Sequence, residues 1–177
     1  MTAHLDIRQA TPEDVPLLLD FIRELAQYER LTHLLAVTER QLALELFGAN
    51  SRVEALLAHC DGEPAAFAVY FHNFSTFLGR RGLYLEDLFV RPPFRRRGCG
   101  RAMLVELARI AHERACGRFE WTVLDWNKPA IDFYRSLGAD VLEDWRICRV
   151  TGAALEQLAE SAMPRPDLAP PADPQEE

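Results

Sequence analysis

The chain has 177 residues, of which 49% are hydrophobic, and its formal net charge at pH 7 is -7. This length supports one well-packed domain and is short for two, and the negative charge opposes general binding to nucleic acid. No apolar run is long enough to span a membrane, and the four cysteines are too widely spaced for a zinc site or a dense disulfide scaffold. We expect a cytoplasmic protein that binds no metal, no nucleic acid and no membrane.

The first half of the chain carries local signals for two helices and a strand hairpin. Before the first helix, Thr11 suits the N-cap and Pro12 suits the first helical position. Before the second helix, Thr38 and Gln41 have the spacing of a capping box. Apolar segments on both sides of the turn "DGEP" indicate the hairpin. The expected elements are a strand over 4–10, helices over 11–30 and 38–48, and strands over 53–60 and 65–74.

The second half of the chain predicts strands and helices in alternation. The expected elements are strands over 83–90, 119–126 and 144–150, helices over 100–115, 129–138 and 153–160, and a loop over 75–82. Hairpins followed by this alternation indicate an α/β (α+β) fold, in which helices flank one central, mixed and mostly antiparallel sheet. From Ser161 onward the chain has five of its eleven prolines and one arginine against four acids, a net charge of -3. We therefore expect a single domain over 1–160 and a disordered tail over 161–177.

The segment "FRRRGCGRAML", residues 94–104, places four arginines around two glycines just before an apolar helix. The unpaired N–H groups and the dipole of a helix start bind anions, and glycines let the backbone approach phosphate oxygens. A P-loop would need a lysine in this segment, and the Rossmann fingerprint would need glycine or alanine in place of Met103. A nucleotide-cofactor loop, a nucleic-acid patch and a solvated helix start remain as interpretations.

The stretch "RRRGCG", residues 95–100, resembles the Arg/Gln-x-x-Gly-x-Gly/Ala acyl-CoA loop of the GNAT N-acetyltransferases. The segments "RELAQYE", "YLEDLFV" and "WNKPAIDFYRSLGA" extend the resemblance to the spermidine/spermine and thialysine branch, over the chain to about residue 160. The resemblance implies a GNAT-type domain that moves acetyl directly from acetyl-CoA to a primary amine. It also implies a cofactor site made of Leu88, Phe89, Val90, Arg95, Arg96, Arg97, Gly98, Cys99, Gly100, Arg101, Asn127 and Tyr134. Taken alone, Asn127 is also typical of an ordinary Asx turn.

The reaction needs a base, because an alkyl ammonium with a pKa of about 10 must lose a proton before it attacks. Glu86 and Asp87 are expected on opposite faces of their strand, so that only one of them can face a given cleft. The resemblance selects Glu86 as the base, acting through water, whereas the residues alone also allow both acids to pair with arginines. It selects Tyr134 as the general acid toward the coenzyme A sulfur. An amphipathic helix alone would make this tyrosine a core residue.

Cys99 suggests a second chemical route, through a covalent acetyl-cysteine. It lies in the glycine loop beside arginines that could lower its pKa. However, no histidine is near in the sequence, and the family has an apolar residue at this position. The other interpretation of Cys99 is a buried small hydrophobic residue.

The amine site that the resemblance implies consists of Tyr28, Glu29, Ser75, Thr76, Glu86 and Trp145. Polyamine enzymes of the family have Asp-Pro-Trp where this chain has Ser75, Thr76 and Phe77, and the missing carboxylate removes a partner for a second ammonium. Ser-Thr-aromatic is typical of the thialysine branch, so we favour thialysine or a short diamine as the substrate. The resemblance also implies a homodimer in which the segment around Trp145 lies near the amine site.

Two other functions remain open. One is a protein acetyltransferase for a lysine or an N-terminus, which would need an open peptide groove. The other is a non-catalytic acyl-CoA-binding protein, which would bind the cofactor without turnover. The presence of both Glu86 and Tyr134 counts against the second function.

Overall fold

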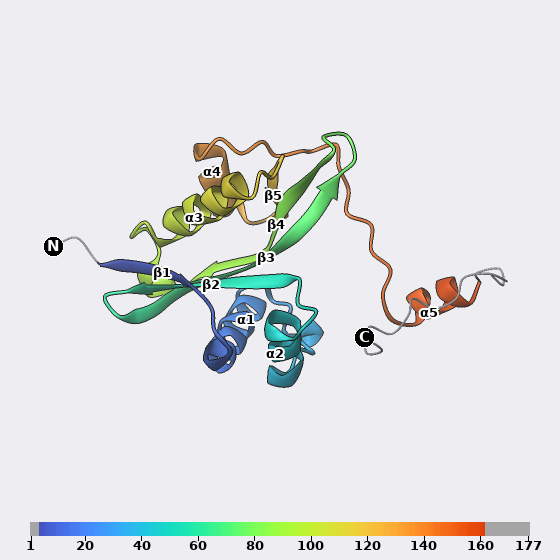
Figure 1. Ribbon diagram of the computed structural model, residues 1–177, viewed down its shortest axis with the longest axis horizontal. Coiled ribbons are helices and arrows are strands. Elements are labelled where there is room, and N and C mark those ends of the chain that lie inside the picture. Colours follow the sequence, from blue (N-terminus) through green and yellow to red (C-terminus); the bar gives the residue numbers. More distant parts are fainter. Residues whose placement is uncertain (1–3, 162–177) are drawn as a thin grey trace. The chain divides into compact units, whose positions relative to one another are not determined.

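The computed structural model describes residues 4–161 (Figure 1). The predicted tail over 161–177 lies outside these residues, except for Ser161. The chain divides into two compact units between Asp125 and Trp126. No helix among the described residues is long and apolar enough to cross a membrane.

The first unit is built on one five-stranded sheet in which the strands lie in chain order. The strands are β1 (Leu5–Gln9), β2 (Val53–Cys60), β3 (Glu63–Ser75), β4 (Arg80–Val90) and β5 (Phe119–Trp121). β1 to β4 are antiparallel neighbours, and β5 pairs with β4 in parallel. A parallel pair needs a crossover connection, which α3 (Cys99–Glu113) provides. The predicted mixed, mostly antiparallel sheet is confirmed.

The helices of the first unit begin close to where the sequence predicts. Thr38 N donates to Gln41 Oε1 over 3.0 Å, and Gln41 N donates to Thr38 Oγ1 over 3.3 Å, so the predicted capping box starts the second helix. At the first helix, Thr11 and Asp14 form an equivalent box around a short 3₁₀ turn, and the α-helix itself begins at Val15. The helical segments that accompany α3 are η1 (Pro12–Asp14), α1 (Val15–Glu29), η2 (Thr32–Leu34), α2 (Glu39–Phe47) and η3 (Pro92–Phe94).

Helices cover both faces of the sheet. Figure 1 shows α1 and α2 on one face and α3 on the other. Under α1 and α2, Phe21 packs in a core with Phe67 and Phe89, and the Phe21 and Phe67 rings stack with centroids 5.3 Å apart. On the other face, α3 buries Met103 and Leu107 and packs against β2, β3 and β4. Both layers bury apolar side chains against β3 and β4, which gives the central strands a fixed position.

The second unit contains α4 (Lys128–Ser136) and α5 (Gly152–Glu160). The predicted strand over 144–150 is wrong, because no strand among the described residues pairs with it, and its side chains are exposed. A segment of strand-like composition becomes a strand only where a neighbour supplies hydrogen-bond partners for its backbone.

Two boundaries in the first unit differ from the predictions. β5 is shorter than the predicted range 119–126, because its ladder with β4 stops at Leu85, just before an irregularity in β4. The predicted loop over 75–82 is also shorter, because the two strands of the hairpin continue until Ser75 pairs with Arg80.

Candidate active site

β4 changes its register against β3 near the middle of the sheet. Leu85 lies opposite Tyr70. Asp87, two residues later, lies opposite Val69, so Glu86 is an additional residue between the two pairs. In a regular strand Leu85 and Asp87 would share a face, but this β-bulge turns Asp87 to the side of Val69, which packs in the core with α1. The bulge therefore puts Leu85 and Asp87 on opposite faces, whereas the orientation of Glu86 relative to Asp87 stays a prediction.

Three carboxyl groups influence one another around the bulge. Burial raises the pKa of Asp87 to about 7, and the charges of Glu86 and Glu29 act in the same direction. Burial also raises the pKa of Glu29, the last residue of α1, whereas the Glu86 side chain is exposed. A carboxyl that titrates near neutral pH suits proton transfer. Asp87 could not be selected from the sequence alone, because its pKa depends on burial in the folded sheet and on Glu29, which lies far away in the chain.

Neither acid of β4 forms an ion pair within residues 4–161. Arg91, four residues after Asp87, is held by Glu24 of α1 at 2.7 Å and also donates to the carbonyl oxygen of Pro64 at 3.1 Å. The interpretation in which both acids pair with arginines therefore does not describe this part of the chain.

The end of α1 meets the same stretch of β4. The Tyr28 ring lies 6.2 Å from the Phe89 ring. The Arg95 guanidinium lies over both rings, 4.6 Å from the Tyr28 centroid and 5.5 Å from the Phe89 centroid. Arg95 Nε also donates to the Val90 carbonyl oxygen over 2.9 Å. The structure thus brings Tyr28, predicted for the amine, against Phe89 and Arg95, predicted for the cofactor.

The edge of β4 that faces β5 has a strand partner for only part of its length. β5 pairs with Leu83 to Leu85 and stops there. From Glu86 to Val90, no strand of the described residues lies along this edge, so the backbone groups that face it belong to no ladder. Such an edge accepts an extended ligand through main-chain hydrogen bonds.

The glycine loop leads directly into the start of α3. Gly98 is the N-cap residue and has a φ of 87°, in the left-handed region that glycine adopts without strain. A Cβ at this position would meet nothing within 4 Å, so the space over the loop is open. The first helical hydrogen bond runs from Ala102 N to Gly98 O over 3.0 Å. The N–H groups that precede Ala102 in the first turn have no carbonyl oxygen four residues earlier within the helix. These N–H groups and the helix dipole form an anion site.

The four arginines around the loop do not point to one place. Arg95 stacks on Tyr28, and Arg97 pairs with Asp61 in the β2–β3 turn at 3.4 Å. Arg96 and Arg101 are exposed. The start of α3 is therefore surrounded by positive charge, but Arg95 and Arg97 already interact with side chains of the protein.

Cys99, the first residue of α3, is buried at 2% exposure. Burial raises the pKa of its thiol. The charge of Arg97 acts in the lowering direction, as expected, but burial outweighs it, so the structure gives no support to a covalent acetyl-cysteine. The interpretation as a buried small residue fits the observed packing.

Ser75 and Thr76 lie at the far end of the β3–β4 hairpin. Ser75 is buried, and its Oγ accepts from Leu78 N over 3.3 Å, so its hydroxyl shapes the turn. It lies six residues along β3 from Val69, which is roughly 20 Å in a strand. Within one chain, the structure therefore does not bring Ser75 to Tyr28 and Glu29.

Three predicted site residues belong to the second unit. Asn127 caps α4, with its side-chain oxygen accepting from Ala130 N over 3.4 Å, as an Asx turn does. Tyr134 lies on α4 with its ring 5.6 Å from the Phe133 ring. Trp145 is 76% exposed. The roles of Asn127, Tyr134 and Trp145 stay predictions.

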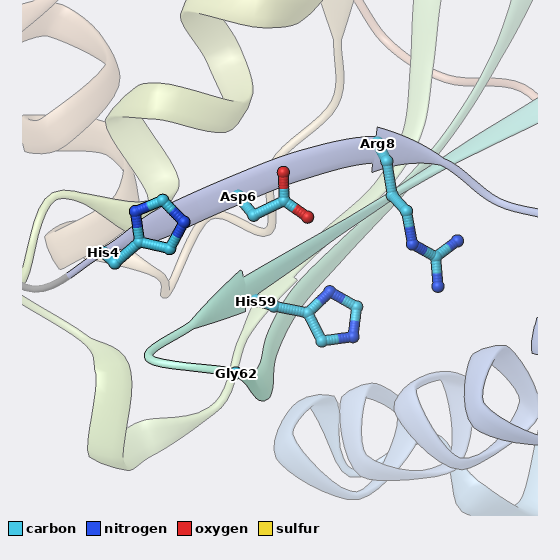
Figure 2. A pocket seen from close by; sticks show the side chains of 5 residues that line it. All are labelled: His4, Asp6, Arg8, His59 and Gly62. Atoms are coloured by element: carbon cyan, nitrogen blue, oxygen red, sulfur yellow. The ribbon is translucent and has the colours of Figure 1, made fainter.

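A shallow depression of about 370 Å³ lies at the other edge of the sheet. Figure 2 shows its lining, which comes from β1, from the residue before it, from the end of β2 and from the β2–β3 turn: His4, Asp6, Arg8, His59 and Gly62. One of its charged groups, Arg8, is bound to Asp14 at 2.6 Å. β2 and β3 separate β1 from β4, so this depression is not part of the site around the bulge. Within the described part of the chain, no three His, Cys, Asp or Glu side chains are grouped as a metal site.

The fold and the glycine loop at the start of α3 are consistent with the resemblance seen in the sequence, and comparison with known proteins shows the family. The chain belongs to the acetyltransferase (GNAT) family, whose model matches residues 18–139. It is an acetyltransferase, and membership of this family implies acetyl-CoA as the cosubstrate.

The chain is similar to two relatives that are named as N-acetyltransferases. It is 36% identical to an L-ornithine N5-acetyltransferase of Arabidopsis thaliana, covering 86% of each chain. It is 37% identical to a thialysine N-epsilon-acetyltransferase of Sus scrofa, covering 86% of this chain and 96% of the relative. Among solved structures, an integron cassette protein from the mobile metagenome of V. cholerae is 30% identical with a TM-score of 0.74, covering 91% of this chain and 99% of that one. These similarities confirm the GNAT fold.

Proposed function

We propose that the protein transfers acetyl from acetyl-CoA to the side-chain amine of a small lysine-like amino acid, such as thialysine, or of a short diamine. The observation that carries this proposal is the second half of β4. Between Glu86 and Val90 this strand has carboxyl groups at one end, an edge without a strand partner in the described residues, and the glycine loop proposed to bind anions at the other end.

The described residues fit acetyl-CoA. The first N–H groups of α3, with the open space over Gly98, suit the pyrophosphate. The backbone of Leu88, Phe89 and Val90 suits the amide groups of the pantetheine arm, as an edge strand pairs with an extended ligand. Arg96 and Arg101 add attraction for the phosphates, together with Arg95 and Arg97. When bound, acetyl-CoA supplies the activated acetyl group and a thiolate leaving group.

The carboxyl pair at the bulge handles the proton of the amine. Glu86 accepts it through water and provides a negative charge that attracts the ammonium. Asp87, with a pKa of about 7, is protonated in a part of the molecules at neutral pH and can exchange protons with its neighbours. Tyr134 protonates the departing sulfur, and Asn127 contacts the cofactor.

The names of the relatives support an amino acid substrate. Ornithine and thialysine, on which those enzymes act, are both amino acids with an amine at the end of the side chain. Glu29, next to Tyr28 at the end of α1, offers a carboxylate for such an amine. Ser75 and Thr76 stand where polyamine enzymes of the family have a carboxylate, which disfavours a second ammonium.

We also propose that the active protein is a homodimer. Between residues 142 and 150, four large apolar side chains are exposed, and Trp145 is the most exposed of them at 76%. A soluble chain gains free energy when such side chains are buried against a partner. Ser75 and Thr76 lie far from Tyr28 within one chain, and a second copy can supply residues to the amine site.

The proposal is tested by measuring coenzyme A release with acetyl-CoA and a panel of amines: thialysine, lysine, ornithine, putrescine, spermine and a lysine-containing peptide. We expect thialysine or a similarly short amine to give a higher kcat/KM than spermine or the peptide. A preference for the peptide would identify a protein acetyltransferase. Binding of acetyl-CoA without turnover of any amine would identify a non-catalytic acyl-CoA-binding protein, and either result would contradict the proposal.

A further inference from the structure

Two buried cysteines meet beside the glycine loop. Cys60 is the last residue of β2 and Cys99 is the first residue of α3, and each is 2% exposed. They belong to one buried cluster with Ala65, against which Leu5 and Phe94 pack. Both are free thiols. The Cys60 side chain lies within hydrogen-bonding reach of the Cys99 thiol, so two thiols from separate elements meet where α3 begins.

The residues next to this pair already connect the same two segments. Asp61, which follows Cys60, forms an ion pair with Arg97 at 3.4 Å, and Arg97 precedes Gly98 in the loop. Asp61 also accepts from the backbone N–H of His4 over 2.9 Å and has a left-handed φ of 54°. The β2–β3 turn is therefore held in place on one side by β1 and on the other by the loop. This arrangement keeps the two sulfurs close to each other.

We infer that Cys60 and Cys99 form a reversible disulfide that weakens the binding of acetyl-CoA. The proposal rests on the proposed function, because it assigns the regulation of the same anion site. A bond between the sulfurs draws them closer than packed contact allows, so the first turn of α3 moves toward β2. The N–H groups assigned to the pyrophosphate belong to that turn, and their alignment with the phosphate is lost.

The chemistry needs a two-electron oxidant, and a peroxide meets this need. One thiolate attacks an oxygen of hydrogen peroxide, the O–O bond breaks, and a sulfenic acid and water form. The second thiolate attacks the sulfenic sulfur, the S–S bond forms, and a second water leaves. The two thiols lose two electrons and two protons in total, and the peroxide is reduced to two waters. Burial raises the pKa of Cys99 and slows its reaction, so oxidation requires sustained peroxide rather than a trace.

The first measurement locates the bond in the wild-type chain. The protein is treated with hydrogen peroxide, remaining thiols are alkylated, and peptides are mapped by mass spectrometry. We expect a Cys60–Cys99 disulfide peptide that disappears after treatment with dithiothreitol. Cys148, which is exposed, reports the oxidant dose within the same molecule. Absence of the disulfide at a dose that fully oxidises Cys148 overturns the proposal.

The second measurement tests the consequence by calorimetric titration with acetyl-CoA. It uses the Cys116→Ser/Cys148→Ser chain, which keeps only the buried pair. We expect its Kd for acetyl-CoA to rise about tenfold or more after oxidation and to return after reduction. Adding Cys60→Ala should leave the reduced Kd unchanged and remove the effect of peroxide. An unchanged Kd despite the mapped disulfide overturns the proposal.

The two proposals fail in different ways. If the reduced chain does not bind acetyl-CoA, the assignment of the anion site fails, while the peptide map still decides whether the disulfide forms. If the Cys60→Ala chain does not fold, the comparison of oxidised and reduced forms of the chain with both buried cysteines still decides the effect on binding.

Discussion

The first half of β4, up to Leu85, and the second half, from Glu86 to Val90, differ in their strand partners and in their side chains. From Leu83 to Leu85 the strand is paired on both edges, and both of these leucines are almost fully buried. From Asp87 to Val90 it is paired on one edge only, and Asp87 and the bulge residue Glu86 influence each other electrostatically. The bulge at Glu86 separates the halves. One additional residue therefore converts a scaffold strand into the wall of a site without breaking its ladder with β3.

The largest effect on kcat should come from Tyr134, which lies on α4 and belongs to neither half of β4. We expect Tyr134→Phe to lower kcat by about 10²–10⁴-fold with little change in either KM, because a general acid acts only as the leaving group departs. Tyr84→Phe is the matched control, since Tyr84 lies in the doubly paired half of β4 with its ring 5.1 Å from Phe71, and it should keep wild-type kcat. If Tyr134→Phe also kept wild-type kcat, the acid would have to be water.

Glu86→Gln tests the second half of β4, from Glu86 to Val90, which has no strand partner on the edge that faces β5. We expect kcat/KM to fall by about 10²-fold at neutral pH. The loss should become smaller as the pH rises, because free amine and hydroxide then replace the function of the base. Glu63→Gln, an exposed substitution at the start of β3, serves as the control. A defect of Glu86→Gln that does not vary between pH 7 and pH 10 would show that Glu86 positions the amine instead of removing its proton.

Asp87, in the second half of β4, should make the free energy of unfolding depend on pH. Its pKa of about 7 in the folded chain lies above the value of about 3.9 in an unfolded chain. The folded state therefore holds a proton that the unfolded state has lost, and the free energy of unfolding should fall as the pH rises from 4 to 7, by at most about 1.4 kcal/mol per pH unit. Asp87→Asn should reduce this decline in urea titrations and leave only the part due to Glu29, whereas Asp140→Asn should retain it in full. An equal decline in both variants would exclude Asp87 as its source.

Gly98→Ala should give the smallest effect and sharpen the boundary of the cofactor site. A Cβ finds space there, but the left-handed φ costs about 1–2 kcal/mol for a non-glycine residue. We expect the KM for acetyl-CoA to rise about tenfold as the loop relaxes, equivalent to about 1.4 kcal/mol. Gly62 has the same φ of 87° in the β2–β3 turn. Gly62→Ala should lower stability by a similar amount, and a similar rise in its KM would mean that the effect of Gly98→Ala reflects general strain.

The parts of the molecule that the sequence predicts well depend on local signals. The capping box of Thr38 and Gln41 starts α2 because both partners lie within one helical turn. The loop of glycines between strand and helix is equally local. These features require no knowledge of the rest of the chain.

The parts that the sequence analysis missed depend on distant partners. The bulge exists because of how β4 aligns with β3, and strand register is a property of two segments, not one. The pKa of Asp87 depends on burial in the folded sheet and on the charge of Glu29, which is far away in the chain. The segment 144–150 has the composition of a strand, but composition cannot tell whether a pairing partner exists.

The chain order of the strands has a consequence for how the site is made in the cell. β2, β3 and β4 are consecutive neighbours in the sheet, so each can pair as soon as it leaves the ribosome. Glu29, Glu86 and Asp87 all belong to this early-synthesised part, whereas Tyr134 is translated later. A nascent chain that has formed the first four strands therefore already holds its buried carboxyl group at the bulge, before the residue proposed as its catalytic partner has been made.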